Sequence, residues 1–104
     1  MHVSVKYIKP ENVRGTYDSS QKCVLLSWSI PDRSLIAGFS ILRRNTDMTN
    51  DAFVHTNDRM IGDTVYSDFT IRTDVTYEYR IASIINGRAE VTSEGVPVKT
   101  ASTD

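Results

Sequence analysis

The feature that most constrains this sequence is the segment from Thr76 to Ile85, TYEYRIASII. Tyr77, Tyr79, Ile81 and Ser83 occupy every second position in it, and aromatic and branched side chains predominate. This period-two pattern is typical of a β-strand with one buried face. Such a strand needs a neighbour along each edge and a second layer over its apolar face, so the segment predicts a protein built from packed β-sheets.

A tight corner is expected immediately before this strand. Residues 72–75 form a polar interruption after Ile71, and Asp74 belongs to a residue type that tolerates the left-handed backbone conformation. A tyrosine just after such a corner can bury its ring and turn its hydroxyl back onto upstream backbone. We therefore assign this role to Tyr77.

The same alternation recurs earlier in the chain. Val24, Leu26 and Trp28 fall on one face of a predicted strand, and Phe39 and Ile41 fall on one face of the next. These inward faces are expected to meet across two sheets. The residues predicted to share one core are Trp28, Phe39, Ile41, Tyr79 and Ile81.

Short strands separated by turn residues predict a two-sheet sandwich without a helix. The expected strands are Glu11–Tyr17, Lys22–Trp28, Ile36–Arg43, Ala52–Val54, Thr64–Asp68, Thr76–Ile85 and Glu94–Thr100. Asn86-Gly87 predicts a two-residue hairpin turn, because both residues tolerate positive φ. Pro97 favours an edge position for the last strand, since proline cannot donate to a neighbouring strand.

Four motifs, in order along the chain, resemble the fibronectin type III family. They are the alternating apolar run ending in Trp28-x-x-Pro31, the Gly-Phe-x-Ile-x-Arg run of residues 38–43, the Tyr-x-Asp-x-x-Ile run of residues 66–71, and the Tyr-x-Tyr-x-Ile run of residues 77–81. In this comparison Ile71 stands for the family's leucine and Tyr77 for its corner tyrosine. Thr73-Asp74 replaces the family's Pro-Gly, which softens the corner. The resemblance implies an all-β fold, a seven-stranded immunoglobulin-like (fibronectin type III) two-sheet sandwich.

The chain of 104 residues fits one domain, which is large enough to bury a core without a metal or a cross-link. The resemblance covers residues 10–100. Residues 1–9 are expected to form either a linker or an extra N-terminal strand, and residues 101–104 are expected to form a C-terminal linker.

Charge and reactive residues argue against several functions. Twelve basic and 13 acidic residues give a net charge of −1, so we expect neither nucleic-acid nor membrane binding. Cys23, His55 and His2 lack the spacing of a catalytic or structural-metal site, so no catalytic, metal or cofactor-binding residue is predicted. Acidic pairs such as Asp63 and Asp68 lie around expected turns, where solvated or backbone-bonding roles are common.

One surface patch is predicted as a candidate interaction site. The outward face of the strands at residues 36–43 and 76–85 carries more apolar side chains than a solvated sheet face needs. The patch consists of Leu42, Arg44, Arg80, Ala82 and Ile84. A neighbouring domain or another partner could cover it.

The resemblance implies a non-catalytic spacer module of a larger bacterial extracellular protein, including one attached to a carbohydrate-active enzyme such as a glycoside hydrolase. The alternative is a module that binds a protein or a glycan through a sheet face or its loops. For glycans, Tyr7 and Tyr17 are the candidate stacking residues. The expected partners are the neighbouring domains of the parent chain, and the module itself is expected to be a monomer. Fold alone does not fix function, so the last step is analogy.

Overall fold

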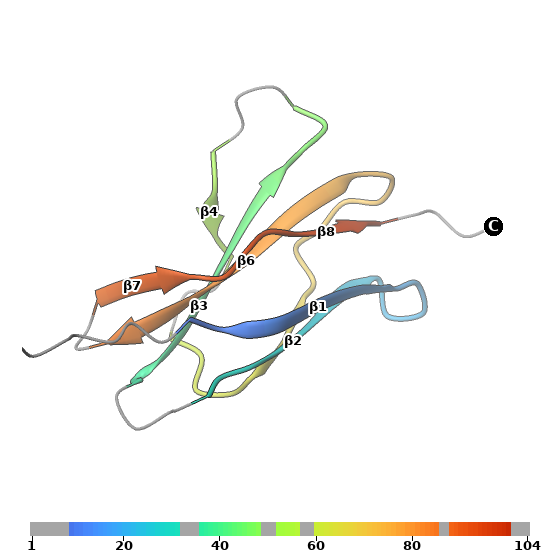
Figure 1. Cartoon of the computed structure of the whole chain (residues 1–104). Helices are drawn as coiled ribbons and strands as arrows, with labels where there is room; N and C mark the ends of the chain where they lie inside the picture. The colour runs from blue at the N-terminus through green and yellow to red at the C-terminus, as the bar shows by residue number, and fades with distance from the viewer. Residues whose placement is uncertain (1–8, 32–35, 49–51, 57–59, 86–87, 101–104) are drawn as a thin grey trace, which may run out of the picture.

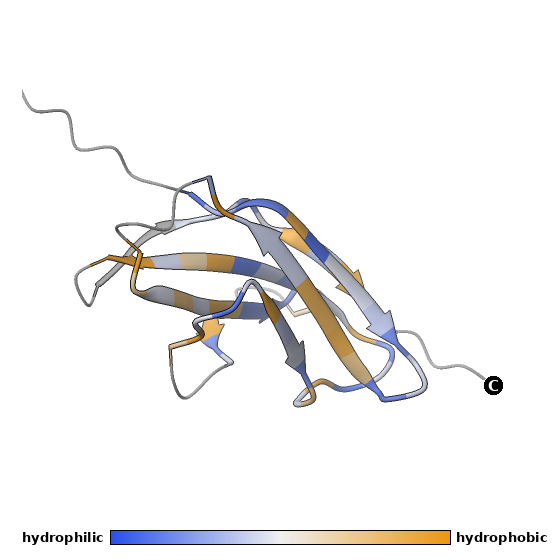
Figure 2. Ribbon diagram, turned by 90° about the horizontal axis from the view of Figure 1, so that it is seen from below, coloured by the Kyte–Doolittle hydropathy of each residue, from blue (hydrophilic) through white to orange (hydrophobic). Residues whose placement is uncertain are grey.

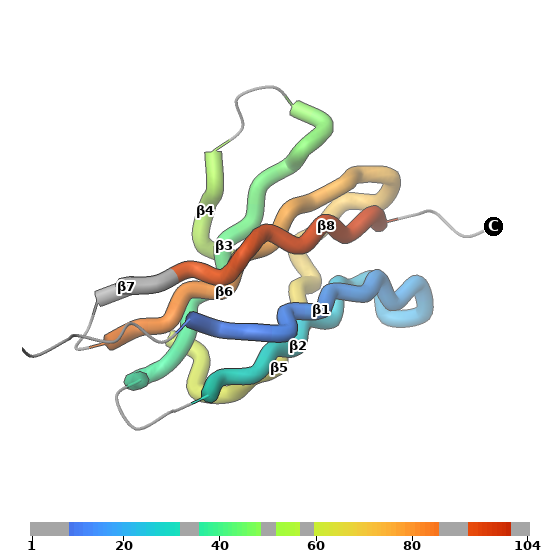
Figure 3. The backbone as a smooth tube through the Cα atoms, in the orientation of Figure 1, coloured from blue at the N-terminus to red at the C-terminus, as the bar shows by residue number. Residues whose placement is uncertain are grey.

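The computed structural model describes residues 9–31, 36–48, 52–56, 60–85 and 88–100, and within these it contains strands and no helix (Figure 1, Figure 3). The strand segments are β1 (Glu11–Asp18), β2 (Cys23–Ser29), β3 (Gly38–Asn45), β4 (Val54–His55), β5 (Val65–Asp68), β6 (Thr76–Ile85), β7 (Arg88–Thr92) and β8 (Val96–Lys99). The predicted hairpin turn at residues 86–87 and the predicted C-terminal linker at residues 101–104 lie outside the described residues, as do residues 1–8 of the segment 1–9 that was predicted as a linker or an extra strand.

The segments form two antiparallel sheets. The first sheet has the strand order β1–β2–β5, and the second has the order β4–β3–β6–β7, with β8 also paired to β6. β7 pairs with the C-terminal half of β6 and β8 with its N-terminal half, so they are two parts of one interrupted strand. Counted in this way, the described residues form seven strands, which confirms the predicted sandwich.

The core lies between the inward faces of the two sheets. Trp28, Phe39, Ile41, Tyr79 and Ile81 belong to one buried cluster, as predicted. Trp28 is only 5% exposed, and its ring meets the ring of Phe39 edge-on with centroids 5.4 Å apart. Hydrophobic and hydrophilic positions alternate along the strands (Figure 2). The predicted register is therefore confirmed.

The corner before β6 is built as the sequence indicates. Asp74 has a φ of 61°, in the left-handed region, and Tyr77 is buried. The backbone N–H of Arg72 donates to the Tyr77 hydroxyl at 3.0 Å. Thr100, just after β8, completes the corner by bonding the N–H and the carbonyl of Val75. The predicted link from Tyr77 to upstream backbone is confirmed, with the hydroxyl as acceptor.

Two predicted strands are wrong in extent, whereas the boundaries of the others match or differ by one or two residues. The strand predicted at Ala52–Val54 is β4, Val54–His55, because Phe53 turns onto the outer face of the second sheet. The strand predicted from Glu94 begins instead at Arg88 and is interrupted after Thr92. At the interruption, Ser93 Oγ accepts the N–H of Ile81 at 2.9 Å and so replaces a backbone partner.

β1 and β8 approach closely where the two sheets meet. A Cβ atom on Gly15 would lie 2.5 Å from Val98 Cγ2, so only glycine allows this approach. β1 begins at one end of the sandwich and β8 ends at the other (Figure 1). The described chain therefore runs in at one end of the domain and out at the opposite end.

Candidate functional site

The five predicted patch residues lie together on the outer face of the second sheet. Pairing of Leu42 with Arg80, and of Gly38 with Ile84, places alternate residues of β3 and β6 on this face. Leu42, Arg44, Arg80 and Ile84 are half-buried, whereas Ala82 is 0% exposed. Ala82 therefore cannot itself contact a partner.

Much of this face is occupied by interactions within the chain. Arg44 Nε donates to Glu78 Oε1 at 2.7 Å, and Arg80 lies 3.6 Å from the other oxygen of the same carboxylate. Both guanidinium groups also lie over the ring of Phe53, 5.3 Å and 4.7 Å from its centroid. Cation–π contacts of this kind hold Phe53 against the sheet. The two arginines are thus already engaged by one shared carboxylate, that of Glu78, and by the ring of Phe53.

Ser40 and His55 meet on the same face. Ser40 Oγ lies 2.7 Å from His55 Nδ1, which ties β4 to β3. A serine nucleophile also needs access to substrate and a group that orients its base. Ser40 is buried, and in the described part of the chain no carboxylate hydrogen-bonds His55. We therefore assign this pair a structural role.

A buried carboxylate joins the two sheets. Asp68 is 0% exposed, so of the two roles expected for it around a turn, solvated or backbone-bonding, the solvated one is wrong, whereas its bond to the Thr70 N–H confirms the backbone-bonding one. Its Oδ2 accepts hydrogen bonds from Tyr79 Oη at 2.7 Å and from Arg43 Nη1 at 2.8 Å. Its Oδ1 accepts from Thr70 Oγ1 at 2.6 Å and from the Thr70 N–H at 3.0 Å. The cluster links β5 of the first sheet to β3 and β6 of the second.

The ionisation of this cluster follows from its contacts. Burial alone would raise the pKa of Asp68, but hydrogen bonds from Thr70, Tyr79 and Arg43 hold that pKa below its ordinary value. The pKa of Tyr79 is raised well above its ordinary value by burial and by the charge of Asp68. Arg43 also packs over the ring of Tyr77, 4.8 Å from its centroid. The carboxylate is thus fixed in its charged form as an inter-sheet clamp.

The other reactive residues are not arranged for chemistry. Cys23 is buried, and burial together with the charges of Asp18 and Asp68 raises the pKa of its thiol, which disfavours the reactive thiolate. Among the described residues, no group of three His, Cys, Asp or Glu side chains is placed to hold a metal ion. That part of the chain also holds no helix that is both long and apolar enough to cross a membrane.

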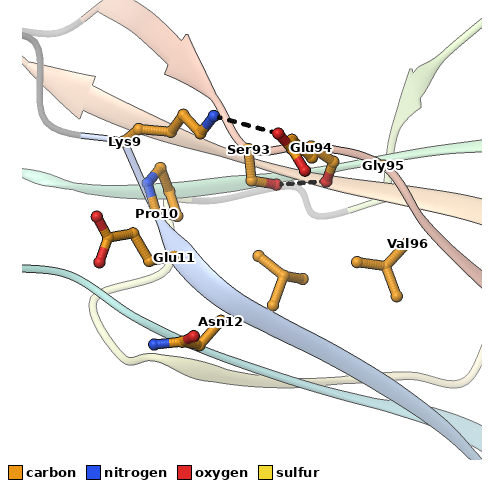
Figure 4. A pocket seen from close by; sticks show the side chains of 9 residues that line it. Lys9, Pro10, Glu11, Asn12, Ser93, Glu94, Gly95 and Val96 are labelled. Carbon is orange, nitrogen blue, oxygen red and sulfur yellow. Dashed lines mark hydrogen bonds and ion pairs between the residues drawn. The ribbon is translucent and has the colours of Figure 1, made fainter.

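A surface hollow of about 460 Å³ lies where β1 begins and where β7 gives way to β8 (Figure 4). Lys9 Nζ and Glu94 Oε1 lie 3.8 Å apart beside it, and Ser93 Oγ donates to the carbonyl of Glu94 at 3.0 Å. Its lining residues are Lys9, Pro10, Glu11, Asn12, Val13, Ser93, Glu94, Gly95 and Val96. This lining contains no aromatic side chain on which a sugar ring could stack. Tyr17, predicted as a stacking candidate, packs against the core instead; Tyr7 lies outside the described residues.

Sequence reasoning missed an exposed apolar group on the other sheet. Leu25, Val65 and Phe69 are 39%, 57% and 60% exposed, although they are large hydrophobic side chains. The alternation along β2 and β5 could have revealed this group, because Leu25 and Val65 fall on the face opposite the inward Leu26 and Tyr66. Phe53 was also missed, since its contacts depend on how residues 52–56 return over the sheet.

These features define an immunoglobulin-like β-sandwich with a tyrosine corner and without an apparent catalytic centre in its described residues. No model of a known protein family matches the sequence, and neither does any curated protein. Among solved structures, an Fn3-like protein from Clostridium thermocellum is 19% identical, with a TM-score of 0.69 over 91% of this chain and 94% of that one. The FN5 domain of Drosophila Lar is 18% identical, with a TM-score of 0.69 over 91% of this chain and 97% of that one.

The particular fold is that of the fibronectin type III domain, as the sequence motifs predicted. The same fold occurs as one part of a larger chain. The twitchin kinase region from C. elegans matches 89% of this chain with 21% identity and a TM-score of 0.67, but the match covers only 17% of the twitchin chain. Domains of this kind are modules of multidomain proteins, which is the setting expected for a linking role.

Proposed function

We propose that this chain is a non-catalytic spacer module of a larger extracellular modular protein. The observation that carries the proposal is the position of the two ends: β1 begins at one end of the sandwich and β8 ends at the opposite end (Figure 1). A domain with this geometry holds its neighbours apart instead of side by side. The twitchin region, in which this fold is one part of a much longer chain, is a precedent for the arrangement.

The length of the spacer follows from its strands. The longest strand, β6, has 10 residues. At a rise of about 3.3 Å per residue it spans roughly 33 Å, which is the length of the sandwich along its strands. The inter-sheet clamp at Asp68 would keep this length constant, because it joins three strands inside the sandwich. A bacterial parent, and attachment to a carbohydrate-active enzyme such as a glycoside hydrolase, are the finer parts of this proposal and follow the family resemblance.

The experiment that tests the spacer role is an amide chemical-shift titration of the isolated domain with soluble polysaccharides. A spacer has no glycan-binding site of its own, so we expect no saturable shifts with polysaccharides at dissociation constants tighter than about 1 mM, which corresponds to roughly −4 kcal/mol. Saturable shifts clustered on Leu42, Arg44, Arg80 and Ile84 would contradict the spacer role and favour a binding module that uses the second sheet.

A second measurement addresses the geometry directly. Dyes attached at positions 9 and 99, on the first residue described and the last residue of β8, report the distance between the two ends of the module. Lys9 Nζ lies 3.8 Å from Glu94 Oε1, and Lys99 is five residues further along the chain, so at about 3.3 Å per residue we expect one narrow distance distribution centred at roughly 20 Å that persists until the domain unfolds. A broad distribution in the folded protein would show that the module does not fix the separation of its neighbours.

A further inference from the structure

The outer face of the first sheet carries large apolar side chains that are exposed to solvent. Leu25 lies at its centre, paired with Thr16 of β1 on one side and with Ser67 of β5 on the other. Val65 is paired with Ser27 on the same face, and Phe69 follows Asp68, whose side chain points inward. Leu25, Val65 and Phe69 are 39%, 57% and 60% exposed. Three large exposed side chains on one three-stranded face suggest a contact surface.

This face is hollowed instead of flat. A depression of about 460 Å³ runs over the three strands, and its outward-facing lining residues are Arg14, Thr16, Leu25, Ser27, Val65 and Ser67. The hydroxyl groups are small, so a partner side chain can approach the sheet between the larger residues. The depression therefore offers space for an apolar side chain beside Leu25 and Val65.

The charges of the face are arranged symmetrically about its centre. Arg14 and Asp18 lie on β1, two residues to either side of Thr16, and pair with Ser27 and Cys23 respectively. At about 3.3 Å per residue, each charge lies roughly 7 Å along the strand from the central row of Thr16, Leu25 and Ser67. The carboxylate of Asp18 lies at the turn after β1, where its Oδ1 accepts the N–H groups of Ser20 and Gln21.

The apolar residues at β5 lie to either side of the same row. Ser67 lies in the central row, Val65 lies two residues before it, and Phe69 follows Asp68, the last residue of β5. A two-fold axis along the central row would therefore place Arg14 of one copy over Asp18 of the other. It would also bring Val65 of one copy over the end of β5 from which Phe69 extends, and Leu25 over its own symmetry mate. The face is complementary to itself in both charge and apolar character.

We propose that the outer face of the first sheet binds the same face of a second copy of this module, with the β1 strands of the two copies antiparallel. This assignment replaces the expectation of a monomer. Three strands about 4.8 Å apart and roughly 20 Å long give a contact of about 300 Å² per partner, below the roughly 800 Å² of a standard interface. The pairing is therefore weak in dilute solution and becomes significant when the parent protein brings copies together.

The test is sedimentation equilibrium of the isolated domain from about 20 μM to 2 mM, with amide chemical shifts recorded over the same range. We expect reversible dimer formation and concentration-dependent shifts on β1, β2 and β5. Val65→Thr with Phe69→Ser removes the apolar pairs and should weaken association at least tenfold. Arg14→Glu places like charges opposite each other and should have a similar effect. Raising the salt concentration from 0.05 to 0.5 M should weaken the wild-type dimer several-fold, because the charge pairs are exposed.

Val54→Thr is the matched control, because Val54 is an exposed valine on the second sheet. This variant should associate as the wild type does. Absence of any dimer at 2 mM, or an equal loss of association in Val54→Thr, would overturn the proposal. The adjoining module of the parent chain could instead bind and saturate this face while the isolated domain does not self-associate. That result would assign the face to the neighbouring module and would also refute the proposal.

Discussion

Replacing Asp68 by asparagine tests whether the buried carboxylate holds the two sheets together. Asparagine has nearly the same shape, so the change removes the charge without leaving a cavity. The carboxylate now accepts from four donors, two at each oxygen. An amide offers one acceptor oxygen and one donor NH₂ group, so two of the four donors lose their acceptor.

The loss of folding stability in Asp68→Asn depends on which of the four donors can still form a hydrogen bond. If the amide oxygen stays with Thr70, the NH₂ group faces Tyr79 and Arg43. The Tyr79 hydroxyl can rotate and accept a hydrogen bond, but the Arg43 guanidinium has no lone pair and is left without its acceptor. Removing one partner of a buried ion pair costs about 3–5 kcal/mol. Because the Arg43 side chain is 18% exposed and keeps its bond to Thr70, we expect a value near 3 kcal/mol.

The assay is urea unfolding followed by the fluorescence of Trp28, the single tryptophan, which is buried in the folded state. With a denaturant slope of about 1.5 kcal/mol per molar, a loss of 3 kcal/mol lowers the midpoint by roughly 2 M. Arg43→Met, alone and combined with Asp68→Asn, completes a double-mutant cycle. Near-additive effects of the two changes would refute the clamp, because residues that stabilise one another must show a coupling energy.

The pH dependence provides an independent check. The pKa of Asp68 is lowered in the folded state, so the unfolded chain takes up this proton first as the pH falls. The stabilisation is therefore complete above the unfolded pKa of about 4 and is lost as the pH falls through the folded value. The difference in stability between wild type and Asp68→Asn should be largest at pH 7 and should shrink below about pH 4. A difference that stayed constant down to pH 2 would show that the lost charge is not its cause.

Three further substitutions test the packing. Trp28→Ala should cost roughly 3–5 kcal/mol in urea unfolding, followed by circular dichroism, since it empties a core position; a cost below 1 kcal/mol would contradict its burial. Tyr77→Phe leaves the Arg72 N–H without its acceptor and should cost about 1–2 kcal/mol, less than the tryptophan change; the reverse order would make the corner dominant. Gly95→Ala adds a Cβ atom that clashes with Glu78 Oε2, so the carboxylate must move away from Arg44 and Arg80. We expect a loss of about 1 kcal/mol in thermal unfolding, and an unchanged melting temperature would show that these ion pairs contribute nothing.

The parts of the fold that were predicted correctly are those in which the sequence pattern directly reports burial. β6 was predicted from Thr76 to Ile85, the range observed, because its inward residues are mostly aromatic or branched and repeat with period two. Trp28 and Phe39 were assigned to the core for the same reason. The left-handed Asp74 was predicted because few residue types tolerate that conformation.

The parts that were missed depend on contacts between distant segments. Ser93 interrupts the last strand because its hydroxyl accepts the N–H of Ile81, which no local pattern records. Asp68 is buried because Arg43 and Tyr79, which lie 25 and 11 residues away, supply its hydrogen bonds. A charged residue at an inward position looks like the end of a strand unless those partners are known.

The two outer faces differ in what they can bind, because their side chains differ in how many contacts they already make within the domain. On the second sheet, the predicted patch includes Ala82, which is fully buried, and its arginines are engaged by Glu78 and Phe53. A partner there would have to displace contacts that already stabilise the domain, so its net gain in free energy would be small. On the first sheet, Leu25, Val65 and Phe69 face solvent. A partner can bury these side chains without breaking a contact like that between the arginines and the Phe53 ring. Association should therefore gain more hydrophobic stabilisation on this face than on the second sheet.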